Sequence, residues 1–149
     1  MRGRVGGDLL RSLLALAIAF VVTTALMNQL FSRGLVVGDF MAPLLLDGDA
    51  IVVERASGRF VDYRVGEIVS LPDGGDSRDR LLARVIAAPG DQVLAGGTQL
   101  RQLGPDEFVI SDDLAQYGRT VLERDDIDGR VLLRAWPPER FKWRPGVSP

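Results

Sequence analysis

The residue types available for catalysis are few, because the chain contains neither histidine nor cysteine. Histidine is the commonest general base and metal ligand, so its absence excludes Ser-His-Asp hydrolysis and histidine metal sites. The absence of cysteine excludes disulfides, thiolate metal sites and cysteine nucleophiles. Of the 18 basic residues only Lys142 is a lysine, and arginine stays protonated near neutral pH. One amine could therefore serve as a base, and we expect neither a cofactor nor a metal.

An apolar segment near the N-terminus is expected to anchor the chain, and any catalytic site that it carries, in a membrane. Leu13–Met27 reads LLALAIAFVVTTALM, and its apolar neighbours extend it to the ~20 residues that span a bilayer core. We predict a single transmembrane helix over residues 9–31, after a cytoplasmic arm of residues 1–8. The positive-inside tendency supports this orientation, because the arginines before or within the segment are Arg2, Arg4 and Arg11, against Asp8.

Two other interpretations of this segment stay open. A charged start followed by an apolar run also describes a cleaved secretory signal, but NQLFSRG after Met27 lacks a small-x-small cleavage signature. A buried core helix is the third interpretation, although a run that is apolar on every face leaves no polar side for water. We favour the uncleaved anchor.

From Ser32 onward, short β-branched and aliphatic runs alternate with turns rich in glycine, proline and aspartate. The connections are too short for helical crossovers, so the sequence predicts a mainly β, largely antiparallel domain over residues 32–149. The predicted strands are Ala50–Arg55, Glu67–Leu71, Leu81–Ala88, Gln92–Ala95, Glu107–Ser111 and Arg130–Trp136.

The charge balance argues against one class of partner. Eighteen Lys and Arg against 20 Asp and Glu give a net charge of -2, so no field of one sign attracts a polyanion. We expect no nucleic-acid partner.

Five segments combine turn residues with apolar strands: VVGDFMAPLLLDGDAIVVER (36–55), YRVGEIVSL (63–71), LLARVIAAPGDQV (81–93), EFVISDD (107–113) and IDGRVLLRAWP (127–137). In this order they resemble the boxes of bacterial signal peptidase I, a family of membrane-anchored serine peptidases that remove signal peptides. The first is similar to the family's G-x-S-M-x-P-T-L and the third to its K-R-V-I-G-x-P-G-D. The resemblance implies a signal-peptidase-like β domain outside the bacterial cytoplasmic membrane, with the N-terminus in the cytoplasm.

The chain departs from the family where the family does its chemistry. The resemblance implies a serine nucleophile at position 40 and a lysine base at position 83, and these positions hold Phe40 and Ala83. Phenylalanine has no nucleophilic atom and alanine has no proton acceptor. Ser111 begins a Ser-Asp-Asp triplet where the family has Gly-Asp-Asn, and we interpret it as a turn residue.

We therefore expect a catalytically inactive relative that binds partner proteins or extended peptides by strand addition, in envelope or complex assembly. The candidate groove residues are Phe40, Met41, Pro43, Ala83, Arg84 and Asp112. Phe40 is either an apolar contact for the partner or a core residue that fills the cleft in which the family has its catalytic serine.

Two rival functions follow from the same residues. The first is an active signal peptidase that cleaves signal peptides with a non-standard catalytic pair, for which Ser111 is the candidate nucleophile. The second is an anchored β domain with a structural role only.

Overall fold

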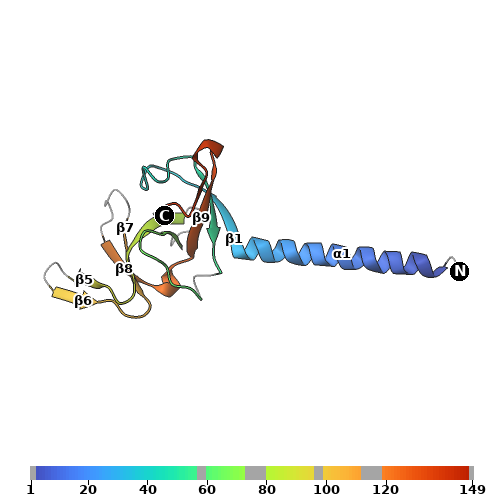
Figure 1. Cartoon of the computed structure of the whole chain (residues 1–149), viewed down its shortest axis with the longest axis horizontal. Helices are drawn as coiled ribbons and strands as arrows, with labels where there is room; N and C mark the ends of the chain where they lie inside the picture. Colours follow the sequence, from blue (N-terminus) through green and yellow to red (C-terminus); the bar gives the residue numbers. More distant parts are fainter. Residues whose placement is uncertain (1–2, 57–59, 73–79, 96–98, 112–118, 148–149) are drawn as a thin grey trace.

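The computed structural model describes residues 3–56, 60–72, 80–95, 99–111 and 119–147 of the 149-residue chain. One long helix projects from a β domain (Figure 1). The elements are α1 (Gly3–Leu30), β1 (Phe31–Leu35), β2 (Ala50–Glu54), β3 (Ile68–Pro72), β4 (Arg80–Ala87), β5 (Gln92–Ala95), β6 (Gln99–Gln102), β7 (Glu107–Ser111), β8 (Arg119–Glu123), η2 (Arg124–Asp126), β9 (Gly129–Trp136), η3 (Pro138–Arg140) and β10 (Lys142–Trp143).

The helix α1 is long and apolar enough to cross a membrane over Leu9–Leu30. These 22 residues measure ~33 Å along the helix axis, which matches a hydrocarbon core of ~30 Å. The helix begins at Gly3, so most of the predicted arm is helical, and it ends at Leu30. Phe31 is the first residue of β1. The amide of Arg55, the residue after β2, donates to the carbonyl of Leu30. The helix and the sheet are therefore joined without a linker.

In the part of the chain that the structure describes, eight strands form the main sheet, in the order β1-β2-β9-β3-β4-β7-β8 with β10 beside β9, and β5 pairs with β6 in a separate ribbon. All strand pairs are antiparallel. The prediction of a mainly β, largely antiparallel domain behind an N-terminal apolar helix is confirmed.

Period-two burial explains why the inner strands form where they do. In β4, Ala83, Val85 and Ala87 are buried, while Leu82, Arg84 and Ile86 are half-buried. Side chains at alternate positions point to opposite faces of a strand, so one face of β4 enters the core. β9 approaches β2 closely at Gly129, where a Cβ atom would lie 2.4 Å from the carbonyl oxygen of Glu54.

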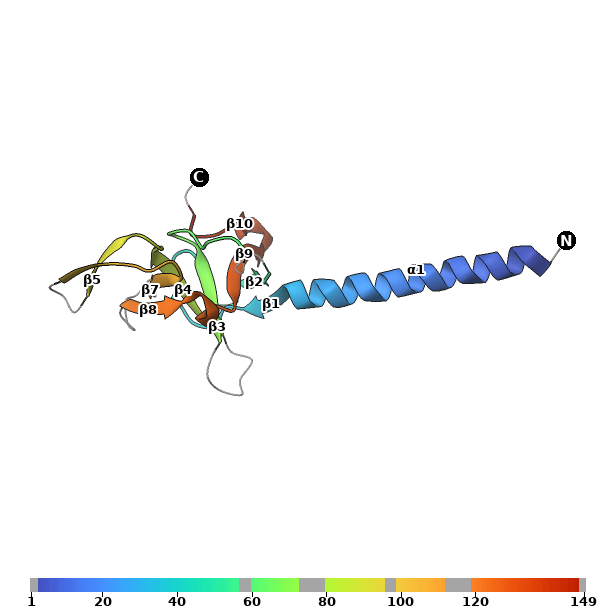
Figure 2. The ribbon, with the colours of Figure 1, turned by 90° about the horizontal axis from the view of Figure 1, so that it is seen from below.

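Among the described residues, the buried side chains of the core form three clusters. The first lies under β1, β2 and the loop that follows β1: Val36, Met41, Leu45, Ile51, Val53, Ile68 and Val131. The second lies under β3, β4 and β7: Tyr63, Val69, Ala83, Val85, Phe108, Ile110 and Ile127. The third supports the β5–β6 ribbon: Ala87, Leu103 and Val109. Figure 2 shows this ribbon at the end of the domain opposite α1.

Candidate functional site

A groove of about 520 Å³ lies between the two edges of the main sheet. Its walls include Ser32–Gly38, from β1 and the residues after it, and Thr120 and Leu122 of β8. β1 and β8 are the end strands of the sheet order, so the sheet curls until its edges face one another. The remaining walls are Phe40, Met41, Ile51, Val53, Leu71, Leu81, Leu82, Ala83, Ile110 and Ser111.

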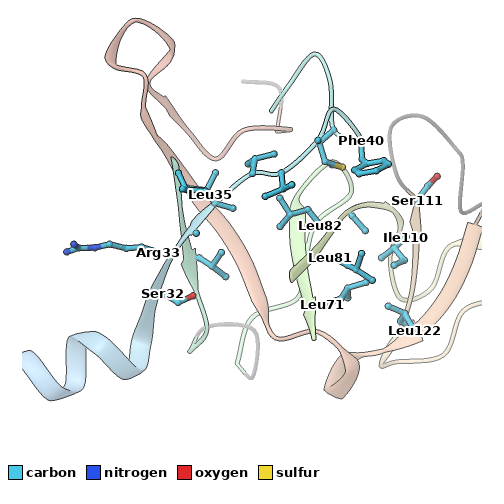
Figure 3. Close-up of a pocket in the computed structure, with 18 of the residues that line it drawn as sticks. Ser32, Arg33, Leu35, Phe40, Leu71, Leu81, Leu82, Ile110, Ser111 and Leu122 are labelled. Carbon is cyan, nitrogen blue, oxygen red and sulfur yellow. The ribbon is translucent and has the colours of Figure 1, made fainter. Parts of the chain in front are cut away.

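The groove is almost entirely apolar. It opens where the first and second core clusters meet, so side chains of both form its floor. Among the described residues that line it, polar side chains are limited to Ser32, Arg33, Ser111 and Thr120. The side chain of Arg33 points away from the groove (Figure 3). Such a surface suits hydrocarbon side chains, with hydrogen bonds supplied mainly by backbone.

Phe40 and Ala83 line this same groove although 42 residues separate them. Phe40 lies in the turn after β1 and its side chain is 40% exposed. Ala83 lies on β4, opposite Val69 of β3, and is buried in the second cluster. The two positions at which the resemblance implies a serine and a lysine therefore face one cavity, and both present only hydrocarbon to it.

Buried charges hold the loop that carries Phe40. The Asp49 carboxylate is 2% exposed and accepts from the Leu46 amide at 2.9 Å and from Arg140 Nη1 at 3.0 Å. Arg134 Nη1 lies 3.7 Å from the same carboxylate and donates to the carbonyl of Leu44. Burial lowers the pKa of Arg134, and the neighbouring Arg140 acts in the same direction. The loop is thus fastened to β9 and η3.

A second charged cluster joins β2, β9 and the residues before β3. Arg130 is buried, with Nη1 3.3 Å from Glu67 Oε1 and Nε 3.4 Å from Glu54 Oε2. Its guanidinium lies 5.2 Å from the ring centroid of Tyr63, whose ring meets Phe108 edge-on at 5.5 Å. Burial raises the pKa of Tyr63, while Arg130 opposes that shift. These groups pair with one another, so their role here is structural.

The other predicted groove residues have different positions. Met41 is buried and lines the groove, whereas Pro43 and Arg84 are not among its lining residues. Asp112 lies outside the described residues. Ser111 ends β7 and does line the groove.

Sequence reasoning missed the β1 wall. Residues Ser32–Val37 contain a weak strand signal, the apolar run Leu35-Val36-Val37, beside a polar pair and a glycine. The single lysine, Lys142, lies on β10 and is not a lining residue. Within the described ranges, no group of three or more acidic side chains could hold a metal ion.

The protein is of the class in which a curled antiparallel sheet with an apolar groove follows an N-terminal apolar helix. Sequence comparison identifies its family. Residues 9–104 match the family described as signal peptidase, peptidase S26. The chain is 31% identical over 119 residues to the mitochondrial ATP-independent inner membrane protease subunit 1a of Arabidopsis thaliana, covering 70% of each protein. It is 27% identical over 136 residues to the mitochondrial inner membrane protease subunit 1 of Schizosaccharomyces pombe, covering 80% of this chain and 85% of that one. The chain belongs to the signal peptidase S26 family.

Proposed function

We propose that this chain is a membrane-anchored, catalytically inactive member of the signal peptidase S26 family that binds an extended segment of a partner protein in its groove. The observation that carries the proposal is that Phe40 and Ala83 line one apolar groove. Peptide hydrolysis needs an attacking oxygen and a base that takes its proton. Neither side chain supplies such a group, while the groove around them is lined by apolar side chains.

The geometry of β1 supports binding by strand addition. The amide of Val36 donates to Asp49 and its carbonyl accepts from Gly48, so Val36 bonds toward β2. Backbone groups alternate in direction along an antiparallel strand, which turns those of Leu35 and Val37 toward the groove. An extended segment laid along Ser32–Val37 would cover ~20 Å and make main-chain hydrogen bonds there.

A proline substitution tests this mode directly. Leu35→Pro removes an outward N–H while leaving the β1–β2 hydrogen bonds of Val36 in place, a position at which an edge strand tolerates proline. Leu35→Ala keeps the N–H and is the matched control. The probe is a fluorescent synthetic peptide spanning the C-terminal part of a secretory signal sequence, bound to the full chain in detergent. We expect Leu35→Pro to weaken binding at least tenfold more than Leu35→Ala, the cost of about one hydrogen bond in a desolvated groove. Equal affinities would contradict strand addition.

Phe40 has two roles to distinguish within this proposal. Its partial exposure supports a contact for the partner, whereas a plug would contribute chiefly to folding. Phe40→Ala separates the two roles. Weaker peptide capture with an unchanged Tm supports the contact, and a lower Tm with unchanged capture supports the plug.

The competing function is an active peptidase that uses Ser111, and the observation in its favour is the position of Ser111 in the groove. The loss of one member of a catalytic triad leaves only ~10³–10⁴-fold catalysis over water, and here two groups are replaced. Incubation of the full chain with a serine-directed acylating inhibitor tests the matter. A covalent adduct that Ser111→Ala abolishes would overturn the inactive assignment; we expect no adduct on either protein.

We propose that the chain is a single-pass protein of a bacterial cytoplasmic membrane with its N-terminus in the cytoplasm, and the resemblance to bacterial signal peptidase I supports this proposal. The arginines before the apolar segment support this orientation. The relatives are named as subunits of inner membrane proteases, which supports a role as one subunit of a membrane complex. Mild solubilisation of the native membrane and purification of the chain should recover a stoichiometric companion. Recovery of the chain alone would favour a structural role.

A further inference from the structure

Neighbouring side chains of β4 enter the groove from opposite faces of the strand. Leu82 packs against the first core cluster, whereas Ala83 belongs to the second. Leu81 lies on the same face as Ala83, and it is in register with Leu71 of β3, which packs against the second cluster. Figure 3 shows Leu82 on the side toward β1 and Leu81 beside Leu71. All four residues line the groove, which therefore reaches both faces of β4.

This part of β4 has an edge that is open to the groove. β4 pairs with β3 from Arg80 to Arg84, whereas its pairing with β7 begins only at Arg84. Within the described ranges, residues 80–83 therefore pair with another strand on one side only. Ser32–Gly38 form the wall that faces them. An extended segment laid along β1 would thus lie between β1 and the open edge of β4.

Both sides of this path are apolar. The lining side chains that belong to the first cluster or pack against it are Val36, Met41, Ile51, Val53 and Leu82. Those that belong to the second or pack against it are Leu71, Ala83, Ile110 and Leu122. Successive side chains of an extended segment point to opposite faces, so every residue of the segment would meet one of these two apolar walls.

A strand with two buried faces has a different sequence from a strand with one. A strand buried on one face alternates apolar and polar residues, whereas a strand buried on both faces is a nearly continuous apolar run. The groove also offers little to a charge. Among its described lining residues only Arg33 is charged, and its side chain points away from the groove (Figure 3). A charge on the bound segment would therefore lose its hydration without gaining a partner.

We propose that the groove selects a segment with uncharged, apolar side chains at consecutive positions, in preference to a segment that alternates apolar and polar residues. This inference rests on the proposed function, because it names the kind of segment that the same groove binds. The partner would be a protein with a short apolar run that can become extended, and the run would be covered on both faces once it is bound.

Three fluorescent peptides test the proposal on the full chain in detergent. Each has six central residues, which span ~20 Å when extended, between pairs of lysines that keep it soluble. The central sequences are VVVVVV, VSVSVS and SVSVSV, and fluorescence anisotropy measures their affinities. We expect the all-valine peptide to bind at least about tenfold more tightly than either alternating peptide, because burial of even one further valine side chain contributes about that factor.

The outcomes separate this inference from the proposed function. If the better alternating peptide binds as tightly as the all-valine peptide, only one face of the segment is received, and the inference is wrong while peptide binding stands. If none of the three peptides binds, both the inference and the proposed function are wrong.

Two adjacent substitutions assign the preference to the two walls. Leu81→Ser and Leu82→Ser each place a hydroxyl on one face of β4, and each should reduce the advantage of the all-valine peptide. Leu94→Ser is the control, because Leu94 is exposed on the β5–β6 ribbon and does not line the groove. It should leave the advantage unchanged.

An advantage that neither groove substitution reduces would come from general hydrophobicity, such as partition into detergent, and would overturn the proposal. The Tm of each variant verifies that it is folded. Leu82 is half-buried, so Leu82→Ala replaces Leu82→Ser if the serine variant unfolds. Leu81 is 52% exposed, and its substitution tests the second wall independently.

Discussion

The ring of Phe40 lies directly over the backbone of Gly38, where an added Cβ atom would be 2.8 Å from ring carbon Cε2. Gly38 has a φ of 82°, and its amide donates to Asp47 Oδ1 at 2.8 Å. Because Gly38 has no side chain, the Phe40 ring can occupy this position at the groove. The hydrogen bond from the Gly38 amide to Asp47 holds the turn beneath the ring. Gly38 and Asp47 together therefore decide where this ring lies.

Substitution of Gly38 should displace the ring. Gly38→Ala adds a Cβ in close contact with Phe40 and places alanine at a positive φ, which costs about 1–2 kcal/mol of stability. Gly48→Ala is the matched control, because Gly48 has a φ of 79° and no neighbour within 4 Å of its Cβ position. Both variants should lose stability in urea, and Gly38→Ala alone should also change peptide binding. Equal binding by the two variants would contradict a role for the ring position.

The buried contacts of Asp49 with Arg134, Arg140 and the Leu46 amide should contribute more to the stability of the groove than an exposed ion pair does. Asp49→Ala leaves Arg134 and the Leu46 amide without their carboxylate inside the domain, which we expect to cost about 3 kcal/mol. Asp128→Ala is the control, because its pair with Arg55 at 3.2 Å is about a third exposed. An exposed pair contributes about 0–1 kcal/mol. Chemical denaturation measures both, and equal losses would refute the special role of Asp49.

Acidification should weaken the contact between the β5–β6 ribbon and β7. The Gly104 amide donates to Glu107 Oε2 at 2.8 Å and Arg101 pairs with the same oxygen, and these contacts hold the pKa of Glu107 below its ordinary value of 4.5. A carboxyl group whose pKa is lower in the folded state stabilises the folded protein at pH values above its ordinary pKa. This stabilisation is lost as pH falls through the pKa of the folded state.

The measurement is the difference in Tm between the unmodified chain and Glu107→Gln. We expect this difference to be greatest near neutral pH and to shrink as pH falls through the lowered pKa of Glu107, because both forms carry a neutral side chain below it. A difference that stays constant across this range would exclude ionised Glu107 as its source.

Restoring a nucleophile alone should not restore hydrolysis. Phe40→Ser supplies a hydroxyl in the groove, but Ala83 offers no base and Lys142 is not among the lining residues. A serine without a base is a weak nucleophile, so we expect turnover of a fluorogenic signal-peptide substrate to stay at the buffer rate. Phe40→Ala controls for the loss of the ring. Turnover by Phe40→Ser above that of Phe40→Ala would mean that another group accepts the proton.

Most of the strands that could be predicted have a buried face. β2, β3, β4, β7 and β9 each match a predicted run, because β-branched or aliphatic residues recur on the side that enters the core. β5 also matches a predicted run, although Leu94 is exposed and Val93 is only half-buried. The sequence-based prediction missed β1, β6, β8 and β10. In β6 every side chain is exposed, and in β8 only Leu122 is even half-buried, so their sequences carry little of the alternation that burial imposes.

The local sequence determined the apolar helix, the inner strands, the turns between them and the types of chemistry the chain lacks, because each depends on residues close together along the backbone. Only the tertiary structure decided that Phe40, Ala83 and Ser111 share a groove, that β1 and β8 form its walls, and that Asp49 is buried against Arg134 and Arg140. These relationships join residues 28 to 91 positions apart. They arise from the curl of the whole sheet, which is set by packing between distant strands and leaves no periodic signal in any one segment.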